Sequence, residues 1–404
     1  MTYAISSAVM PSLFQSITTT SLALVLASAT VFGQDTRAGV IAEQQAEKAQ
    51  RLEPNVARGA EKFLDWVEGH FTSPNQVYVT FGGLYPSSGF GPGVAVRQAF
   101  GHARFNAGVA YSIRGYKMAQ ASLRFPDLAG EKLDIGTHVR YDDATQVPFY
   151  GIGNNTQEAD RVNFGLKAIE AGANLAFTPV RWYRIGGGLA VKRIEDRAGE
   201  GNHPSIETLG SAGAPGLFDE ARYRQATVFT AIDWRESPGY TRSGGLYSIA
   251  WHDFNDSDNP FSFRRFDAEV QQYLPVLNEH WVLAFRGMLQ AADVDDDQLV
   301  PYYLLPSLGG ARRHRGFSDF RFHDQNMMLL TGEYRWLPSR VIDMALFVDA
   351  GKVTHQRRDL DFSNLKTAYG IGIRIHGPTF TPLRLDVANS KEGLRIHLTG
   401  GVAF

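Results

Sequence analysis

Two segments between residues 326 and 351 alternate between apolar and polar side chains with a period of two, as successive residues of a β-strand do. One face of the first carries Met328, Leu330, Gly332, Tyr334 and Trp336, and one face of the second carries Ile342, Met344, Leu346, Val348 and Ala350. The opposite faces hold carboxylates, Glu333 in the first segment and Asp349 in the second. The pattern predicts two strands, and it leaves open whether the apolar face meets a protein core or lipid.

Segments of this kind recur about 16 times between residue 76 and the end of the chain, an even number as single-chain outer-membrane barrels have. The longest connections between them are 143–160, 195–221, 294–325 and 352–366. All four follow odd-numbered segments, whereas connections after even-numbered segments are mostly short. This asymmetry is typical of an up-and-down barrel with short turns at one end and long loops at the other, and a Greek-key sandwich would not produce it.

Composition and the N-terminal sequence narrow the class of protein further. The net charge of -2 and the pI near 6.6 give no basic surface for nucleic acid, and the absence of cysteine excludes disulfide and cysteine-metal chemistry. Residues 1–33 contain an apolar run and are predicted to be a signal peptide, the alternatives being a wrongly assigned start or a buried strand. Residues 34–75 are predicted to be a short, partly helical periplasmic segment, and residues 76–404 the barrel.

Three short motifs resemble those of a known family. They are LGGARRHRGF at 308–317, EYR at 333–335 and FVDAG at 347–351. The chain resembles the bacterial surface antigen family of outer-membrane β-barrels, which includes the central subunit of the barrel-assembly machinery and the two-partner secretion transporters. The resemblance implies an all-β fold: a transmembrane, antiparallel, up-and-down barrel of about 16 strands with a long loop folded into the lumen. Residues 34–75 are too few for a polypeptide-transport-associated domain of about 75 residues, so the chain resembles a short member.

The resemblance also implies a lock between that loop and the barrel wall. Arg315, in the RGF motif with Gly316 and Phe317, would form an ion pair with Asp349, and Glu333 would face the same interior from the adjacent strand. One alternative is that Arg315 is a solvated arginine on a flexible loop tip. Another is that Arg312 or Arg313 pairs with the carboxylates in its place. Family members usually have an aliphatic residue where this chain has His314, which predicts weaker packing of the tip.

Further loop and terminal residues carry predictions of their own. Gly309 and Gly310, like Gly316, fit either a loop that approaches the wall closely or ordinary turns. The last segment, 394–404, alternates to its end at Phe404, which resembles a C-terminal assembly signal, the alternative being the end of a core strand. Gly400 and Gly401 would lower the pairing strength of that strand and favour a weak seam with the first one.

The resemblance implies a function in assisting polypeptides to insert into or cross the bacterial outer membrane, without an energy source. A passive pore or structural protein plugged by its own loop is the alternative, and an outer-membrane lipase is a third possibility for which no serine–histidine pair stands out. No enzymatic activity, metal or cofactor is expected. The expected partners are outer-membrane lipid and lipopolysaccharide, client polypeptides and the barrel-assembly machinery for insertion of the chain itself, which is expected to be a monomer.

Overall fold

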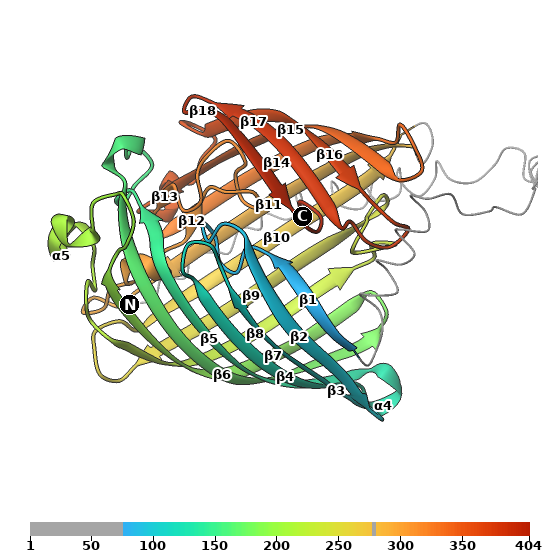
Figure 1. The fold of residues 1–404 in the computed structure, drawn as a ribbon, viewed down its shortest axis with the longest axis horizontal. Helices are drawn as coiled ribbons and strands as arrows, with labels where there is room; N and C mark the ends of the chain where they lie inside the picture. The colour runs from blue at the N-terminus through green and yellow to red at the C-terminus, as the bar shows by residue number, and fades with distance from the viewer. Residues whose placement is uncertain (1–75, 277–279) are drawn as a thin grey trace, which may run out of the picture. The chain divides into compact units, whose positions relative to one another are not determined.

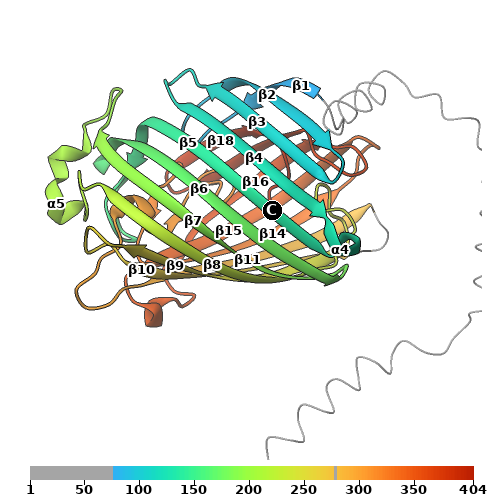
Figure 2. The same cartoon turned by 90° about the horizontal axis from the view of Figure 1, so that it is seen from below.

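The structure, a computed structural model, describes residues 76–276 and 280–404. These residues form one antiparallel sheet of sixteen strands, in which each strand pairs with the next along the chain. The sheet curls into a nearly closed barrel (Figure 1 and Figure 2), which confirms the predicted all-β, up-and-down architecture. The predicted signal peptide at 1–33 and helical segment at 34–75 lie outside the described residues.

The sixteen strands correspond to the sixteen segments predicted from the alternation. The first eight are β1 (Gln76–Gly82), β2 (Gly91–Phe100), β3 (Ala103–Tyr111), β4 (Lys117–Asp127), β5 (Leu133–Phe149), β6 (Val162–Val180), β7 (Tyr183–Ala198) and β8 (Ala221–Asp233). The second eight are β9 (Gly244–Asp256), β10 (Phe263–Pro275), β11 (Trp281–Asp293), β14 (Asn326–Trp336), β15 (Ile342–Thr354), β16 (Lys366–Ile375), β17 (Leu383–Ser390) and β18 (Gly393–Thr399).

The connections contain a few short elements. They are α4 (Leu128–Glu131), η1 (Glu158–Asp160), η2 (Ile206–Leu209), α5 (Gly210–Gly213), η3 (Tyr302–Leu304), β12 (Ser307–Leu308), β13 (Phe322–His323) and η4 (Arg357–Asp359). No helix of the described ranges is long and apolar enough to cross a membrane. The long connections follow odd-numbered segments, as predicted, so one end of the barrel carries the long loops and the other the short turns.

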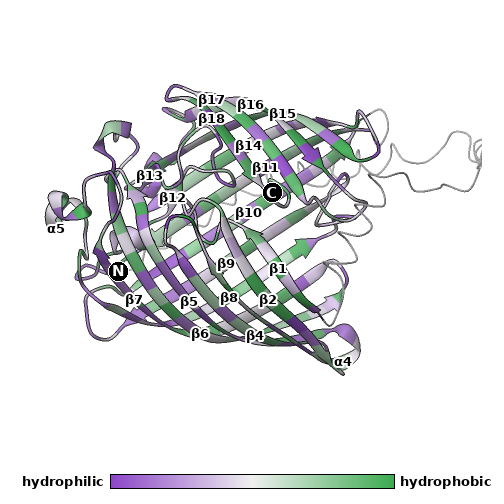
Figure 3. Cartoon of the chain, viewed as in Figure 1, coloured by the Kyte–Doolittle hydropathy of each residue, from purple (hydrophilic) through white to green (hydrophobic). Residues whose placement is uncertain are grey.

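The strands expose their apolar residues and bury their charged ones, which reverses the usual arrangement of a soluble protein. On β15 the side chains of Leu346 and Val348 are 51% and 54% exposed, whereas Phe347 and Asp349, which alternate with them, are 3% and 1% exposed. Figure 3 shows the resulting mixture of hydrophobic and hydrophilic positions along the strands. The apolar face therefore points away from the barrel and the polar face points into it.

The first and last strands do not pair with each other. The sheet begins at β1 and ends at β18, and within residues 76–276 and 280–404 no backbone pairing joins these two strands. We call this junction the seam. Every other neighbouring pair in the sheet is joined by an antiparallel ladder, so the seam is the one interruption of pairing among the described strands.

The prediction that the last strand runs to the end of the chain is wrong. Strand β18 ends at Thr399, and the chain turns away at Gly401, which has a φ of 81° and donates from its backbone N–H to the carbonyl of Thr381. Phe404 is 7% exposed and packs with Tyr273, whose hydroxyl donates a 2.8 Å hydrogen bond to the Phe404 carbonyl. Since Tyr273 is an inward-facing residue of β10, the last residues return to the inner face of the wall.

Candidate functional site

The long connection between β11 and β14 is a folded hairpin. Its short strands β12 and β13 pair Ser307 with His323 and Leu308 with Phe322, which closes residues 309–321 into what we call the loop tip. Six residues of the hairpin and the wall form a buried apolar cluster: Leu308, Phe317, Phe322, Met327, Leu329 and Val353. Because the last three belong to β14 and β15 and are buried on the side opposite the exposed apolar residues, the cluster attaches the hairpin to the inner face of the wall.

The glycines of the tip are required by close approach and by backbone conformation. Gly309 and Gly310 have φ values of 124° and 91°, a region that favours glycine. A Cβ atom on Gly309 would stand 2.1 Å from the carbonyl oxygen of Ser318, and one on Gly310 would stand 2.0 Å from Oδ1 of Asp319. At Gly316 a Cβ would lie 2.2 Å from Cβ of Ala368, on β16. The interpretation as ordinary turn glycines therefore does not hold for these three positions.

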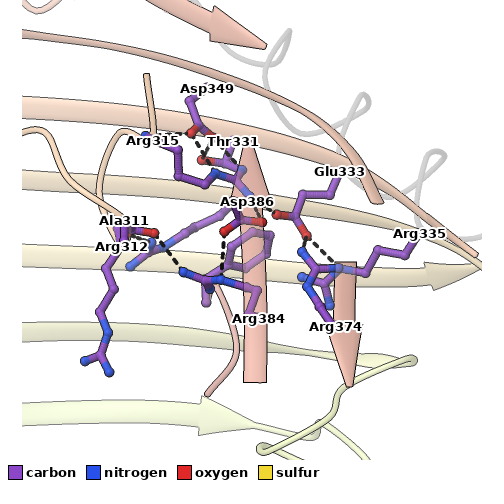
Figure 4. Close-up of polar contacts among 12 residues, drawn as sticks. Ala311, Arg312, Arg315, Thr331, Glu333, Arg335, Asp349, Arg374, Arg384 and Asp386 are labelled. Atoms are coloured by element: carbon purple, nitrogen blue, oxygen red, sulfur yellow. Dashed lines mark hydrogen bonds and ion pairs between the residues drawn. The ribbon is translucent and has the colours of Figure 1, made fainter. Parts of the chain in front are cut away.

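Arg315 is the residue that the tip presents to the wall (Figure 4). Its Nε and Nη2 donate to the two carboxylate oxygens of Asp349 at 2.9 and 2.8 Å, and its backbone N–H donates to the same carboxylate at 3.0 Å. Nη1 donates to Glu333 at 2.6 Å. The guanidinium also lies over the ring of Phe347, 3.4 Å from its centre, and the side chain is only 3% exposed. The alternative of a solvated arginine is therefore not what the structure contains.

The neighbouring arginines of the tip have other positions. Arg313 donates from Nη1 to the carbonyl and hydroxyl of Ser307, both at 2.8 Å, within the hairpin itself. Arg312 is exposed, and its side chain points away from the charged cluster in Figure 4. Arg315 is thus the arginine of the tip that meets the carboxylates of β14 and β15.

The ion pair belongs to a larger buried network on the same face of four strands. Glu333 also accepts hydrogen bonds from Arg335 at 2.7 Å and from Arg374 at 2.8 Å. Asp386 lies 4.0 Å from Arg315 and forms a 2.7 Å ion pair with Arg384, which in turn donates to the carbonyl of Ala311 in the tip. Sequence reasoning missed these four partners. Their signal was present, because alternation places them on the same faces as Glu333 and Asp349.

Burial makes this network sensitive to the loss of any charge. Burial by itself disfavours the charged form of Arg315, but Asp349 and Glu333 outweigh it, so the pKa of Arg315 is raised above its ordinary value.

Burial lowers the pKa of His314, which holds the imidazole neutral. Its Nε2 contacts the carbonyl of Lys366 at 2.8 Å, and its ring packs edge-on against Phe317. His314 is thus fully buried in the tip, and its weaker packing relative to an aliphatic residue stays a prediction.

The loop tip contacts both sides of the seam. On the side of the last strands, the carbonyl of Arg315 contacts Nε2 of His397 on β18 at 2.7 Å, and the carbonyl of Gly316 accepts from Ser390 at 2.7 Å. On the side of the first strand, Asp319 accepts from the backbone N–H of Ser87 at 2.9 Å and from its hydroxyl at 3.2 Å. Ser87 belongs to the connection between β1 and β2. The tip therefore bridges the two sides of the seam, which the sheet does not join.

Arg321 ties a third connection to the same site, and sequence reasoning did not identify it. Its side chain is 1% exposed and pairs with Glu392 in the turn between β17 and β18, at 2.9 Å. It also donates to the hydroxyl and carbonyl oxygens of Thr156, in the connection between β5 and β6, at 2.8 and 2.7 Å. Nearby, Glu158 of that connection pairs with Arg395 of β18. Two ion pairs at the long-loop end thus attach β18 and the turn before it to other connections.

Substitution of Gly316 by alanine is expected to lower the free energy of unfolding by about 1–3 kcal/mol, the usual cost of overpacking. The added methyl would overlap Ala368 and come within 2.9 Å of Ser390 Cβ. Denaturant titration of the purified barrel in detergent measures the loss. Gly287→Ala is the matched control, because its new Cβ has only an ordinary contact of 3.8 Å with Leu330. Equal stabilities of the two variants would contradict the close approach.

The short-turn end of the interior is also occupied. The connection 234–243, between β8 and β9, reaches the connection 376–382, between β16 and β17, although the two lie far apart along the sheet. The rings of Tyr240 and His376 stack with centres 3.8 Å apart, and Thr381 donates to the carbonyl of Gly239 at 3.1 Å. The connection 234–243 therefore crosses the interior at this end, close to Arg335, which contacts the carbonyl of Thr241.

Comparison with known proteins finds one family domain in this sequence and several solved barrels of similar fold. Residues 244–404, from β9 to the end of the chain, match the Omp85 superfamily domain. No curated protein matches the sequence. Among solved structures, BamA from Haemophilus ducreyi lacking POTRA domains 1–3 aligns with a TM-score of 0.61 and 17% identity over 81% of this chain and 70% of its own.

Two further structures align over a similar share of the chain. CdiB from Escherichia coli has a TM-score of 0.54 and 12% identity, covering 82% of this chain and 68% of its own. CdiB from Acinetobacter baumannii has a TM-score of 0.50 and 12% identity over 81% of this chain, which spans 59% of that protein. At these identities the similarity establishes the fold alone.

Proposed function

We propose that this chain, whose residues 244–404 match the Omp85 superfamily domain, lies in the bacterial outer membrane and assists polypeptides to insert into or cross that membrane. The observation that carries the proposal is the seam. β1 and β18 each have one edge without a partner strand among the described residues. Such edges are templates for another strand, because their backbone N–H and C=O groups can pair with it.

The proposed mechanism is β-augmentation at the seam. A client strand pairs with the free edge of β18 or β1, and its side chains alternate between lipid and interior as those of the wall do. Val77, Val79 and Phe81 of β1 and Leu394, Ile396 and Leu398 of β18 are all more than half exposed, which suits a lipid-facing continuation of the sheet. Pairing supplies the driving force, so the mechanism needs no catalytic residue, cofactor or nucleotide.

In this mechanism the loop tip sets how far the seam opens. It contacts His397 and Ser390 on one side and Ser87 on the other, through hydrogen bonds that do not involve the strand edges. The buried pairs of Arg315 fix the tip to β14 and β15, well inside the continuous part of the wall. The seam can therefore part at its unpaired edges while the hairpin remains anchored.

A reconstitution assay tests the proposal. The full chain in vesicles is expected to accelerate the folding of a urea-unfolded outer-membrane barrel into the same bilayer by about tenfold or more, a change of roughly 1.4 kcal/mol in the barrier. Protease protection of the client against time measures the rate, with protein-free vesicles and vesicles holding an unrelated closed barrel as controls. A rate equal to that of both controls would overturn the proposal.

Conductance across a planar bilayer separates this function from a passive pore. The interior holds the loop tip, the connection 234–243 and the returning chain end at Phe404, each in contact with inward-facing residues. We expect the barrel to show no steady open current. A high and constant open probability would instead support the pore.

A further inference from the structure

The outer wall contains a groove that the proposed mechanism does not use. It measures about 700 Å³ and extends across β11 and β14 to β18 on the exposed face. Its lining includes Phe285, Gly332, Leu346, Val348, Ile371 and Leu394. This volume falls within the roughly 300–1,000 Å³ of sites that hold small molecules, although the groove is open along the surface.

The groove exists because a glycine interrupts the outward row of large apolar side chains. Gly332 pairs directly with Phe285 on one side and with Val348 on the other, and both of these side chains are about half exposed. No atom lies within 4 Å of the position that a Cβ on Gly332 would occupy. A glycine inside a strand often marks a place where a ligand approaches the backbone closely.

The lining is apolar along its length and polar at one end. Leu346 pairs with Ile371, and Ile371 with Val387, so adjacent strands present aliphatic side chains side by side. At the long-loop end, Tyr369 and Asn389 are paired across the strands, and the Asn389 amide donates a 3.0 Å hydrogen bond to the Tyr369 hydroxyl. The Glu333 carboxylate near the groove is buried in the interior network and does not face outward.

The backbone around the groove excludes a polypeptide strand as its occupant. β14, β15, β16 and β17 are each paired on both edges, so none of them offers free N–H or C=O groups for β-augmentation. The ligand must therefore bind by apolar contact, with polar atoms only at the end near Tyr369 and Asn389. An acyl chain with a polar head group has this distribution of polarity.

We infer that the groove centred on Gly332 holds an acyl chain of a lipid of the surrounding membrane. The chain lies along Phe285, Leu346, Val348 and Ile371, and its head-group end lies toward Tyr369 and Asn389. Since Leu394 of β18 is part of the lining, the bound lipid lies beside the seam. This inference rests on the proposed location of the barrel in a membrane.

Photolabelling with a phosphatidylethanolamine that carries a diazirine on one acyl chain tests the inference. The full chain is reconstituted in vesicles that contain this lipid, irradiated, and mapped by peptide mass spectrometry. We expect labelling of β14 to β16 around Gly332 to exceed that of other outward-facing strands. Gly332→Leu fills the groove and is expected to abolish the excess, whereas Gly287→Leu, outward-facing on β11 but outside the lining, is expected to retain it.

Three other results would overturn the inference, and they are distinguishable. Uniform labelling of all outward strands means that the lipids are ordinary neighbours of the barrel, with the membrane location intact. Retention of the excess in Gly332→Leu places the bound lipid elsewhere on the wall. Absence of label on every strand overturns the membrane location as well as the groove.

Discussion

Substitution of Arg315 by alanine is expected to lower the free energy of unfolding by about 3–5 kcal/mol, because the loss of one partner leaves buried charges uncompensated. Asp349 would keep a single side-chain donor, the Thr331 hydroxyl at 2.9 Å, and Glu333 would lose its shortest hydrogen bond. Denaturant unfolding of the purified barrel in detergent, followed by the shift in electrophoretic mobility on heating, measures the effect. We also expect faster proteolysis of residues 309–321, since the tip would lose its attachment to the wall.

Arg312→Ala is the matched control, because it removes an exposed arginine from the same tip and is expected to change stability by less than about 0.5 kcal/mol. A second variant tests the cause of the loss. The double variant Arg315→Ala with Asp349→Ala is expected to lose less free energy of unfolding than the two single variants lose together. The reason is that neither charge of the pair is then left without its partner. If Arg315→Ala proves as stable as Arg312→Ala, the lock between the tip and the wall does not exist.

Substitution of Phe404 by alanine is expected to destabilise the refolded barrel by about 3–5 kcal/mol, the range for removing a buried aromatic ring. The ring packs against Tyr273, Val282 and Ala284, and the guanidinium carbon of Arg335 lies 5.1 Å from its centre. The same detergent titration measures the change. Phe362→Ala is the control, because that ring is 76% exposed in the connection between β15 and β16.

This measurement also separates two roles for the chain end. A terminal phenylalanine that acts only as an assembly signal affects insertion in the cell and leaves the purified, refolded barrel unchanged. A ring that packs in the interior destabilises the purified barrel itself. Equal stability of Phe404→Ala and Phe362→Ala in detergent would therefore contradict the inward position of the tail.

The strands could be predicted from sequence because one physical constraint applies at every position. In a wall with one apolar and one polar face, alternation fixes which side chains point outward, as Leu346 and Val348 do against Asp349. The same rule puts Arg335 on the inward face with Glu333, and it could have assigned Arg384 to the interior, since Arg384 shares a face with Asp386. The pairing of Arg315 with Asp349, by contrast, required the family resemblance, because spacing along the chain does not determine where a long loop closes.

Other features follow from contacts that no local pattern encodes. The contact of Asp319 with Ser87 joins residues 232 positions apart, and both lie in irregular connections. The crossing of 234–243 depends on the shape of the opposite rim, where Tyr240 meets His376. The alternation of 394–404 was misleading at its end, because Gly401 adopts a positive φ that takes the chain out of the sheet.

Cross-linking of the seam tests the central claim most directly, and the absence of cysteine from the chain provides a clean background. Cysteines at Val79 and Ile396, joined by a cleavable thiol reagent that spans the seam, would link β1 to β18. Cysteines at Val387 and Ile396, which are direct partners across β17 and β18, form the control. We expect the linked seam to lose client folding in the vesicle assay and to regain it on cleavage, while the linked control remains active. A linked seam that accelerates client folding as well as the control does would contradict the account.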